Sequence, residues 1–239
     1  MDRDDELGWE TDLELNDYYP SPAEIREALA EAEAASARHV REAAVEPSLV
    51  EFEVPWLRIS SELVEGFRKT LDAANDERPL QRFLERNPGP LVIPLRGGHG
   101  RWVLPQTRLG GQYVPDFMVA EKSSIGFEWV AVELESPRAR LFTKRGDPAV
   151  ALNHAIRQVS DWRAWLKSNR AYAVAPRNDS GLGLVDVDSD VPAWILIGRR
   201  FDQDPADNSR RREMSQRLNI AIHSYEWLLE LAEARASEQ

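Results

Sequence analysis

The sequence contains no cysteine, and this absence excludes disulfide bonds and thiolate metal sites. It also lacks an uninterrupted apolar stretch long enough to cross a bilayer. Its first ten residues, MDRDDELGWE, have neither the basic region nor the hydrophobic core of a secretory signal. We therefore expect a cytoplasmic protein with no membrane partner. Its 239 residues suffice for one good core and a smaller appendage.

Basic residues are scarce at one end of the chain only. The net charge is −11, but residues 1–55 alone hold sixteen acidic and four basic residues. The remainder holds twenty-five acidic and twenty-six basic residues, so it is close to neutral and has local basic clusters. Net acidity argues against a nucleic-acid partner, but here it is confined to the N-terminal segment. The rest of the chain is compatible with DNA binding.

The sequence indicates two regions, an acidic extension at 1–58 and a larger domain at 59–239. Residues 1–19 are acidic and poor in branched apolar residues, which is typical of disorder. Ser21-Pro22-Ala23-Glu24 has the pattern of a helix start, with Ser as N-cap and Glu three residues later, and the helix is expected to run to Val45. This helix is either a solvated acidic segment or a competitor of DNA phosphates for a basic groove.

The segment Tyr113–Pro137, YVPDFMVAEKSSIGFEWVAVELESP, has the pattern of a β-hairpin. A turn centred on Ser124–Ile125 sets Asp116 opposite Glu133 in an antiparallel register. Alternation places Trp129, Ala131, Glu133 and Glu135 on one face of the second arm, and Val130, Val132 and Leu134 on the other. Three acids thus converge at one end of the hairpin. Because like charges at this spacing repel, such a cluster holds protons or a cation unless it is a solvated strand end.

Asp116 after a proline, followed by Glu133-x-Glu135 at the end of an apolar strand, resembles the PD-(D/E)XK nuclease signature, with Glu135 in place of the usual lysine. The wider context resembles the Shedu anti-phage defence nucleases over roughly Leu80–Leu231. The motifs that carry this resemblance are LQRFLERNP (Leu80–Pro88), VPDFMV, WVAVELESP and AIRQVSDWRAWL (Ala155–Leu166).

The resemblance implies a divalent-metal-dependent DNA endonuclease that acts against phage or other invading DNA and assembles as a homo-oligomer, a dimer or tetramer. Asp116, Glu133 and the carbonyl of Leu134 would hold Mg²⁺ or Mn²⁺. Glu135 would bind a second ion or accept a proton, and Gln158 would orient water or bind phosphate. Glu85 is expected to form a surface salt bridge rather than assist the metal. His154 alone is expected to be a partly buried helix residue.

The segment after the hairpin is basic. Arg138, Arg140, Lys144 and Arg145 follow the acids without an intervening acid, which indicates phosphate contacts or a solvated loop. Lys144 is the lysine that could replace the missing motif lysine.

The expected fold is α/β, a restriction-endonuclease-like (PD-(D/E)XK) core with a mixed sheet flanked by helices and an acidic helical extension. Strands are expected at Leu91–Leu95, Arg101–Arg108, Pro115–Glu121, Trp129–Glu135, Ala171–Pro176, Trp194–Gly198 and Ile220–His223, and Leu49–Val54 as a linker or edge strand. Helices are expected from Ser60 or Ser61 through Leu71 and at Pro79–Arg86, Asp147–Asn169, Asp204–Leu218 and Tyr225–Ala234.

Two other functions are compatible with the sequence. The missing lysine favours a nuclease-fold protein that binds DNA or a protein partner without cutting. A metal enzyme that acts on a phosphorylated small molecule is the third.

Overall fold

The computed structural model describes residues 21–42, 47–55, 59–96, 98–202 and 205–238. The chain divides into two compact units, Met1–Ala43 and Ala44–Gln239. In the first, helix α1 (Pro22–Glu42) begins at the predicted capping motif. The Ser21 N–H donates to Glu24 Oε2 at 2.6 Å, and the Glu24 N–H donates to Ser21 Oγ at 3.3 Å. The predicted disorder of residues 1–19 lies outside the described residues.

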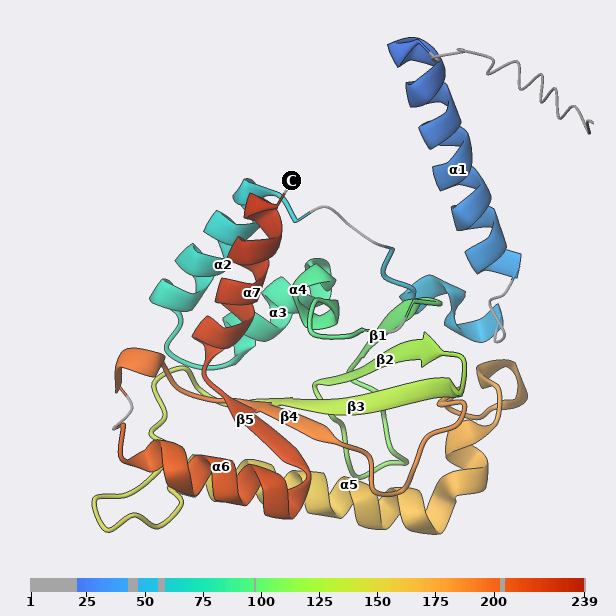
Figure 1. The fold of residues 1–239 in the computed structure, drawn as a ribbon. Coiled ribbons are helices and arrows are strands. Elements are labelled where there is room, and N and C mark those ends of the chain that lie inside the picture. The colour runs from blue at the N-terminus through green and yellow to red at the C-terminus, as the bar shows by residue number, and fades with distance from the viewer. Residues whose placement is uncertain (1–20, 43–46, 56–58, 97, 203–204, 239) are drawn as a thin grey trace, which may run out of the picture. The chain divides into compact units, whose positions relative to one another are not determined.

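The second unit is built on a five-stranded mixed sheet (Figure 1). The strands lie in the order β1-β2-β3-β4-β5. The first three pair antiparallel, and β4 and β5 continue parallel to β3. Their bounds are β1 (Arg101–Pro105), β2 (Phe117–Ser123), β3 (Gly126–Leu134), β4 (Ala193–Leu196) and β5 (Ile220–His223).

Helices cover both faces of this sheet (Figure 1). α5 (Val150–Val174) and α6 (Asp207–Leu218) lie on one side, and α2 (Ser61–Ala73), α3 (Arg78–Arg86), the short α4 (Gly89–Val92) and α7 (Tyr225–Ser237) on the other. Short 3-10 helices lie at η1 (Pro47–Phe52), η2 (Arg177–Asp179) and η3 (Arg200–Asp202). Each face of the sheet has its own apolar core.

The alternation predicted for β3 decides which core each of its side chains enters. Trp129 and Ala131 belong to the core under α5, whereas Val132 and Leu134 belong to the core under α2 and α7. The hairpin register is also as predicted, since Ser123 pairs with Gly126 and Phe117 with Val132. One step beyond Phe117, this register brings Asp116 opposite Glu133.

Two predicted strands are helical. Residues 91–95 contain the end of α4 and a turn, because Pro88 and Pro90 favour a helix start. Ala171–Val174 continues α5 beyond a kink at Asn169 (φ −126°, ψ 24°), because alanine favours helix and Pro176 follows only after the end.

The second unit begins earlier than the predicted domain boundary at residue 58. Residues 47–52 form η1 rather than a strand, and Leu49 is buried in the core under α5. Glu53 forms a single antiparallel bridge with Trp102. These contacts attach residues 47–53 to the sheet, although their acidity groups them with the extension.

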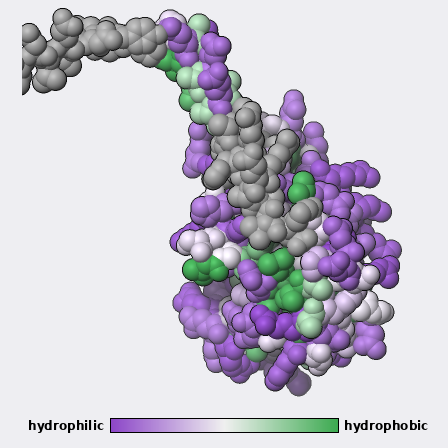
Figure 2. Space-filling view, turned by 90° about the vertical axis from the view of Figure 1, so that its right-hand side faces the viewer, coloured by the Kyte–Doolittle hydropathy of each residue, from purple (hydrophilic) through white to green (hydrophobic). Residues whose placement is uncertain are grey.

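The surface of the described residues is largely hydrophilic on the face that Figure 2 shows, where it is broken by a small hydrophobic patch. Among the described helices, none combines the length and apolar character that a membrane span requires.

A buried arginine ties the end of β4 to two helices. Arg199 is 8% exposed, and its guanidinium donates to Glu226 on α7, to Asp72 Oδ1 on α2 at 3.0 Å and to the Leu71 carbonyl at 3.3 Å. Burial by itself lowers the pKa of Arg199, but Glu226 and Asp72 together raise it. Burial raises the pKa of Glu226, but the hydrogen bonds from Arg199 and the Arg200 N–H outweigh this effect, so the pKa is lowered overall. Arg199 and Glu226 are therefore both charged in the folded protein, and their ion pair stabilises the arrangement of α2, β4 and α7.

We expect Glu226→Gln to destabilise the protein by about 3 kcal/mol, because it leaves the buried Arg199 charge without its main partner. Glu230→Gln on the same helix breaks a half-exposed pair with Arg200 and should cost less than about 1 kcal/mol. Urea unfolding of both variants measures the difference. Equal losses would show that Arg199 is not a structural tie.

Candidate active site

The predicted acids meet at the carboxyl end of β3. Asp116 lies just before β2, Glu133 is the penultimate residue of β3, and Glu135 follows that strand. Asp116 Oδ2 accepts a 2.8 Å hydrogen bond from the Leu134 N–H, which fixes this carboxylate across the hairpin. As expected, the Leu134 side chain lies in the opposite core, 2% exposed.

Glu133 is the most deeply buried of the three acids, at 5% exposure. Its Oε1 accepts a hydrogen bond from Gln158 Nε2 on α5, the glutamine that the sequence singled out. Its Oε2 is buried and has no hydrogen-bond partner in the structure. Burial, together with the charges of Asp116 and Glu135, raises the pKa of Glu133 to about 9, against the lowering effect of Gln158. A buried carboxylate in this position holds a proton or requires a cation.

Asp116 shares this environment. Burial, together with the negative charges of Glu77, Glu135 and Glu85, raises its pKa to about 7, against the hydrogen bond from Leu134. Glu85 itself is exposed on α3, and among the described residues no ion pair of Glu85 is found, so the predicted surface salt bridge does not form there. Its charge acts on Asp116 instead.

Glu135 contacts the histidine that the sequence analysis set aside. His154 Nδ1 on α5 lies 3.1 Å from Glu135 Oε1, and which atom carries the proton depends on the tautomer. Burial raises the pKa of Glu135, and His154 lowers it. The expectation that His154 is simply a helix residue is therefore wrong in one respect, because its ring faces an acid of the site. The sequence contained an indication of this contact, since positions 154 and 158 lie one turn apart on one face of α5.

Glu77 and Tyr225 are two further residues that sequence reasoning missed. Glu77 precedes α3, is partly buried, and raises the pKa of all three acids. Tyr225, at the start of α7, is fully buried and donates its hydroxyl to the Glu135 carbonyl at 2.8 Å. Burial raises the pKa of Tyr225, so this hydroxyl keeps its proton. Neither residue lies in a motif, because both reach the site only through tertiary packing.

Three side chains have the arrangement of a metal site. One ligand atom each of Glu133, Glu135 and His154 lie within 4.8 Å of one another. The unpartnered Oε2 of Glu133 and the raised pKa values of the acids fit a divalent cation, which would relieve both costs. Carboxylates suit Mg²⁺ and Mn²⁺, whereas an imidazole favours transition ions, so the donor set is better matched to Mn²⁺.

The predicted basic residues do not all lie together. Arg138 donates through Nε and Nη2 to the Ala74 and Asp72 carbonyls at 3.1 and 3.2 Å, so it closes the end of α2. Arg140 and Lys144 line a cavity of about 150 Å³ beside α6, and the three acids do not line it. The structure therefore places Lys144 against α6 rather than in the lysine position of the motif. Arg145 is exposed in the same loop.

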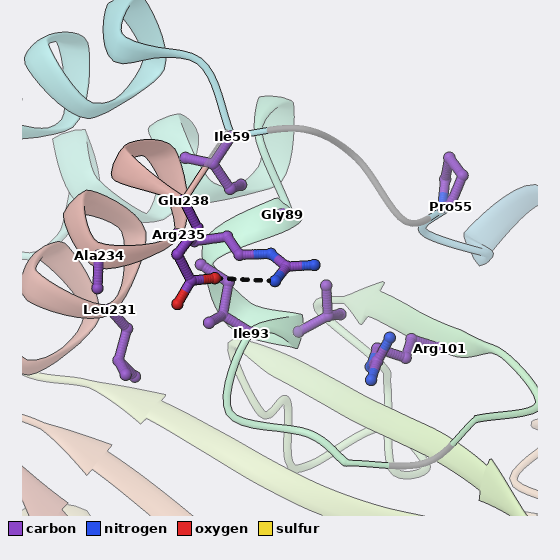
Figure 3. Close-up of a pocket in the computed structure, with 10 residues that line it drawn as sticks. Pro55, Ile59, Gly89, Ile93, Arg101, Leu231, Ala234, Arg235 and Glu238 are labelled. Carbon is purple, nitrogen blue, oxygen red and sulfur yellow. Dashed lines mark hydrogen bonds and ion pairs between the residues drawn. The ribbon is translucent and has the colours of Figure 1, made fainter. Parts of the chain in front are cut away.

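Another cavity, of about 270 Å³, lies between α4, α7 and β1 (Figure 3). Its wall is chiefly apolar, with Arg101 near one side and the Arg235–Glu238 ion pair near the other. None of the predicted site residues lines it.

The raised pKa values predict a pH-dependent stability in the presence of EDTA. A carboxyl group whose pKa is raised on folding holds its proton in the folded state after the unfolded chain has released it. The free energy of unfolding should therefore fall as the pH rises from about 5 through 7 and 9, by on the order of 3 kcal/mol. Glu133→Gln should flatten this decline, whereas Glu128→Gln, at an exposed position of the same strand, should leave it unchanged. Urea unfolding at several pH values measures it, and an equal slope in all three proteins would contradict the buried-acid account.

Comparison with solved structures gives distant similarity only. Restriction endonuclease FokI is 16% identical with a TM-score of 0.38, covering 72% of this chain and 28% of that one. A second structure, of FokI bound to DNA, is 14% identical with a TM-score of 0.34, covering 92% and 31% respectively. The chain thus spans about three tenths of the length of the FokI chains. No curated protein matches it.

A match to a protein-family model identifies the family of the chain. Residues 74–229 match the model described as Shedu protein SduA, C-terminal. The matched range is well over half of the chain, includes all three acids, His154 and Gln158, and contains the whole sheet. The expected α/β fold, a mixed sheet with helices on both faces, is confirmed. The chain belongs to the Shedu family.

Proposed function

We propose that the protein is a divalent-metal-dependent DNA endonuclease that acts in defence against phage or other invading DNA. The observation that carries the proposal is the buried, unpartnered oxygen of Glu133 among two other acids at the carboxyl end of β3. Membership of the Shedu family supports the nuclease activity and the defensive role. We further propose a cytoplasmic homo-oligomer, a dimer or tetramer, with an acidic N-terminal extension and a nuclease domain that includes residues 59–239.

Glu133, Asp116 and the Leu134 carbonyl would hold the ion, with Glu135 and His154 as further ligands on the α5 side. When bound, a divalent ion polarises the phosphoryl oxygen and lowers the pKa of a coordinated water. Gln158 holds the Glu133 carboxylate through Oε1 and leaves Oε2 for the ion. The Leu134 N–H holds Asp116 in the same way.

Glu135 occupies the position of the motif lysine, and its partner is His154. The Glu135 carboxylate would either bind an ion or accept a proton from the attacking water, and His154 orients it. A carboxylate in place of the lysine removes one positive charge beside the reacting phosphate. The reaction should therefore depend more strictly on the metal ion, with Mn²⁺ preferred to Mg²⁺.

The same departure from the motif favours the second candidate, a nuclease-fold protein that binds DNA without cutting. The two candidates differ in one outcome, which is cation-dependent nicking of plasmid DNA.

We expect the purified protein to nick supercoiled plasmid with Mn²⁺ and more slowly with Mg²⁺, and Glu133→Gln to lower the rate at least about 100-fold by removing a ligand charge. Gel electrophoresis of the nicked form gives the rate, and Glu128→Gln is the matched control. DNA binding without nicking in any cation would support the second candidate. Nicking that persists in Glu133→Gln would reject this site.

We expect His154→Ala to reduce the nicking rate by about 10- to 100-fold and to raise the Mn²⁺ concentration needed for half-maximal rate, because it removes both a ligand and the partner of Glu135. Asn153→Ala, one residue away and exposed, is the control. An unchanged metal dependence would show that His154 is not part of the metal site.

A further inference from the structure

Two adjoining cavities lie outside the acidic site, where α6 meets the edge strand β5 and the start of α7. Their volumes are about 430 and 340 Å³, within the range of small-ligand sites. They share Asn208, Arg211 and His223. Among the described residues that line them there are three arginines, Arg200, Arg211 and Arg212, and no acid.

The three arginines bring positive charge to the two cavities. Arg211 is partly buried, and burial together with the charges of Arg200 and Arg212 lowers its pKa. Arg200 is held by Glu230, which does not line either cavity. An anion between these guanidinium groups would relieve their mutual repulsion, and arginine binds phosphate in a bidentate geometry.

One side of the second cavity is aromatic. The rings of His223 and Trp227 are stacked, with centroids 3.8 Å apart and an interplanar angle of 9°. Burial and the charge of Arg211 together lower the pKa of His223 to about 4, so the imidazole is neutral near pH 7. Stacked neutral rings beside a cationic wall are the combination that binds single-stranded nucleic acid, since bases stack on the rings and phosphates pair with the arginines.

The sheet register places these cavities near the acids. Leu134 pairs with Leu196, and Leu196 pairs with His223, so His223 lies two strands away from the segment that carries Glu133 and Glu135. At ordinary strand spacing this separation is roughly 10 Å. The carboxyl ends of β3, β4 and β5 point to the same end of the sheet, because the three strands are parallel (Figure 1). His223 is in register with Leu134, so its ring lies on the α7 face of the sheet and the acid side chains lie on the α5 face. A DNA strand that crosses this end of the sheet would reach both.

We propose that these cavities bind an unpaired nucleotide of the DNA strand, with its phosphate on Arg211 and its neighbouring arginines and its base against the His223–Trp227 pair. The proposal rests on the proposed function, because it takes DNA as the substrate. A base in an intact duplex is stacked on both sides and cannot enter a cavity of this size. The site therefore selects single-stranded segments, frayed ends or gaps over intact duplex.

The test is fluorescence anisotropy at low salt in EDTA, which separates binding from cleavage. The probes are a labelled single-stranded oligonucleotide of mixed sequence, the duplex formed from it, and a strand of abasic units. The full chain should bind the single strand more tightly than the duplex. Arg211→Gln should weaken single-strand binding about tenfold, the cost of one charge-assisted hydrogen bond. Arg217→Gln, exposed on the same helix and outside both cavities, should change it less than twofold.

A second variant tests whether a base stacks on the His223–Trp227 pair. His223→Leu keeps the bulk of the side chain and should weaken binding of the normal strand about fivefold, the effect of one lost stacking surface. It should leave binding of the abasic strand unchanged. Circular dichroism checks that each variant is folded.

Three results would overturn the proposal: equal affinity for duplex and single strand, equal losses in Arg211→Gln and Arg217→Gln, or no binding of the single strand. None of these outcomes depends on nicking. A failure of the nuclease proposal, binding without cutting, is therefore distinguishable from a failure of this one.

Discussion

The burial of the Glu133 carboxylate is the constraint on which the site depends. Its position on the inward face of β3 follows from the same alternation that buries Trp129 and Ala131. An apolar residue there would pack without an electrostatic cost. A carboxylate in the same place has one oxygen held by Gln158 and the other left without a partner, with Asp116 and Glu135 nearby. A group so placed is costly unless a proton or a cation compensates it, and this cost is what makes the site suited to hold a metal ion.

The surrounding structure fixes the acids in place. Asp116 is held by the Leu134 N–H, Glu135 by His154 through its side chain and by Tyr225 through its carbonyl. These hydrogen-bonding groups come from β3 itself and from α5 and α7, which lie on opposite faces of the sheet. Arg199, whose partners lie on α2 and α7, ties the neighbouring strand to the same helices. Glu133, His154 and Gln158 lie on regular elements, and Asp116 and Glu135 directly flank β2 and β3, an arrangement that gives precise geometry.

Much of the sheet and half of the site could be predicted from the sequence. The turn at Ser124–Ile125 and the period-two pattern of β3 determine the register, and the register alone brings Asp116 and Glu133 together. Gln158 was predicted from the resemblance to the nuclease family, and the helical pattern placed it on α5. Residues 91–95 and 171–174 were assigned wrongly, since short apolar runs suit a strand or a helix equally and only their tertiary setting decides. Glu77 and Tyr225 could not be predicted, because their proximity to the acids results from packing between distant segments. The contact of His154 with Glu135 was missed, although its position one turn from Gln158 indicated it.

Calorimetric titration of Mn²⁺ at pH 7.5 tests the central claim most directly, because it measures the ion without requiring a substrate. One or two Mn²⁺ ions should bind each chain with a dissociation constant below about 1 mM, and Glu133→Gln should weaken binding at least about tenfold through loss of a ligand charge. Glu128→Gln should bind as the unaltered chain does. No saturable binding by the unaltered chain, or the same affinity in Glu133→Gln, would contradict the account.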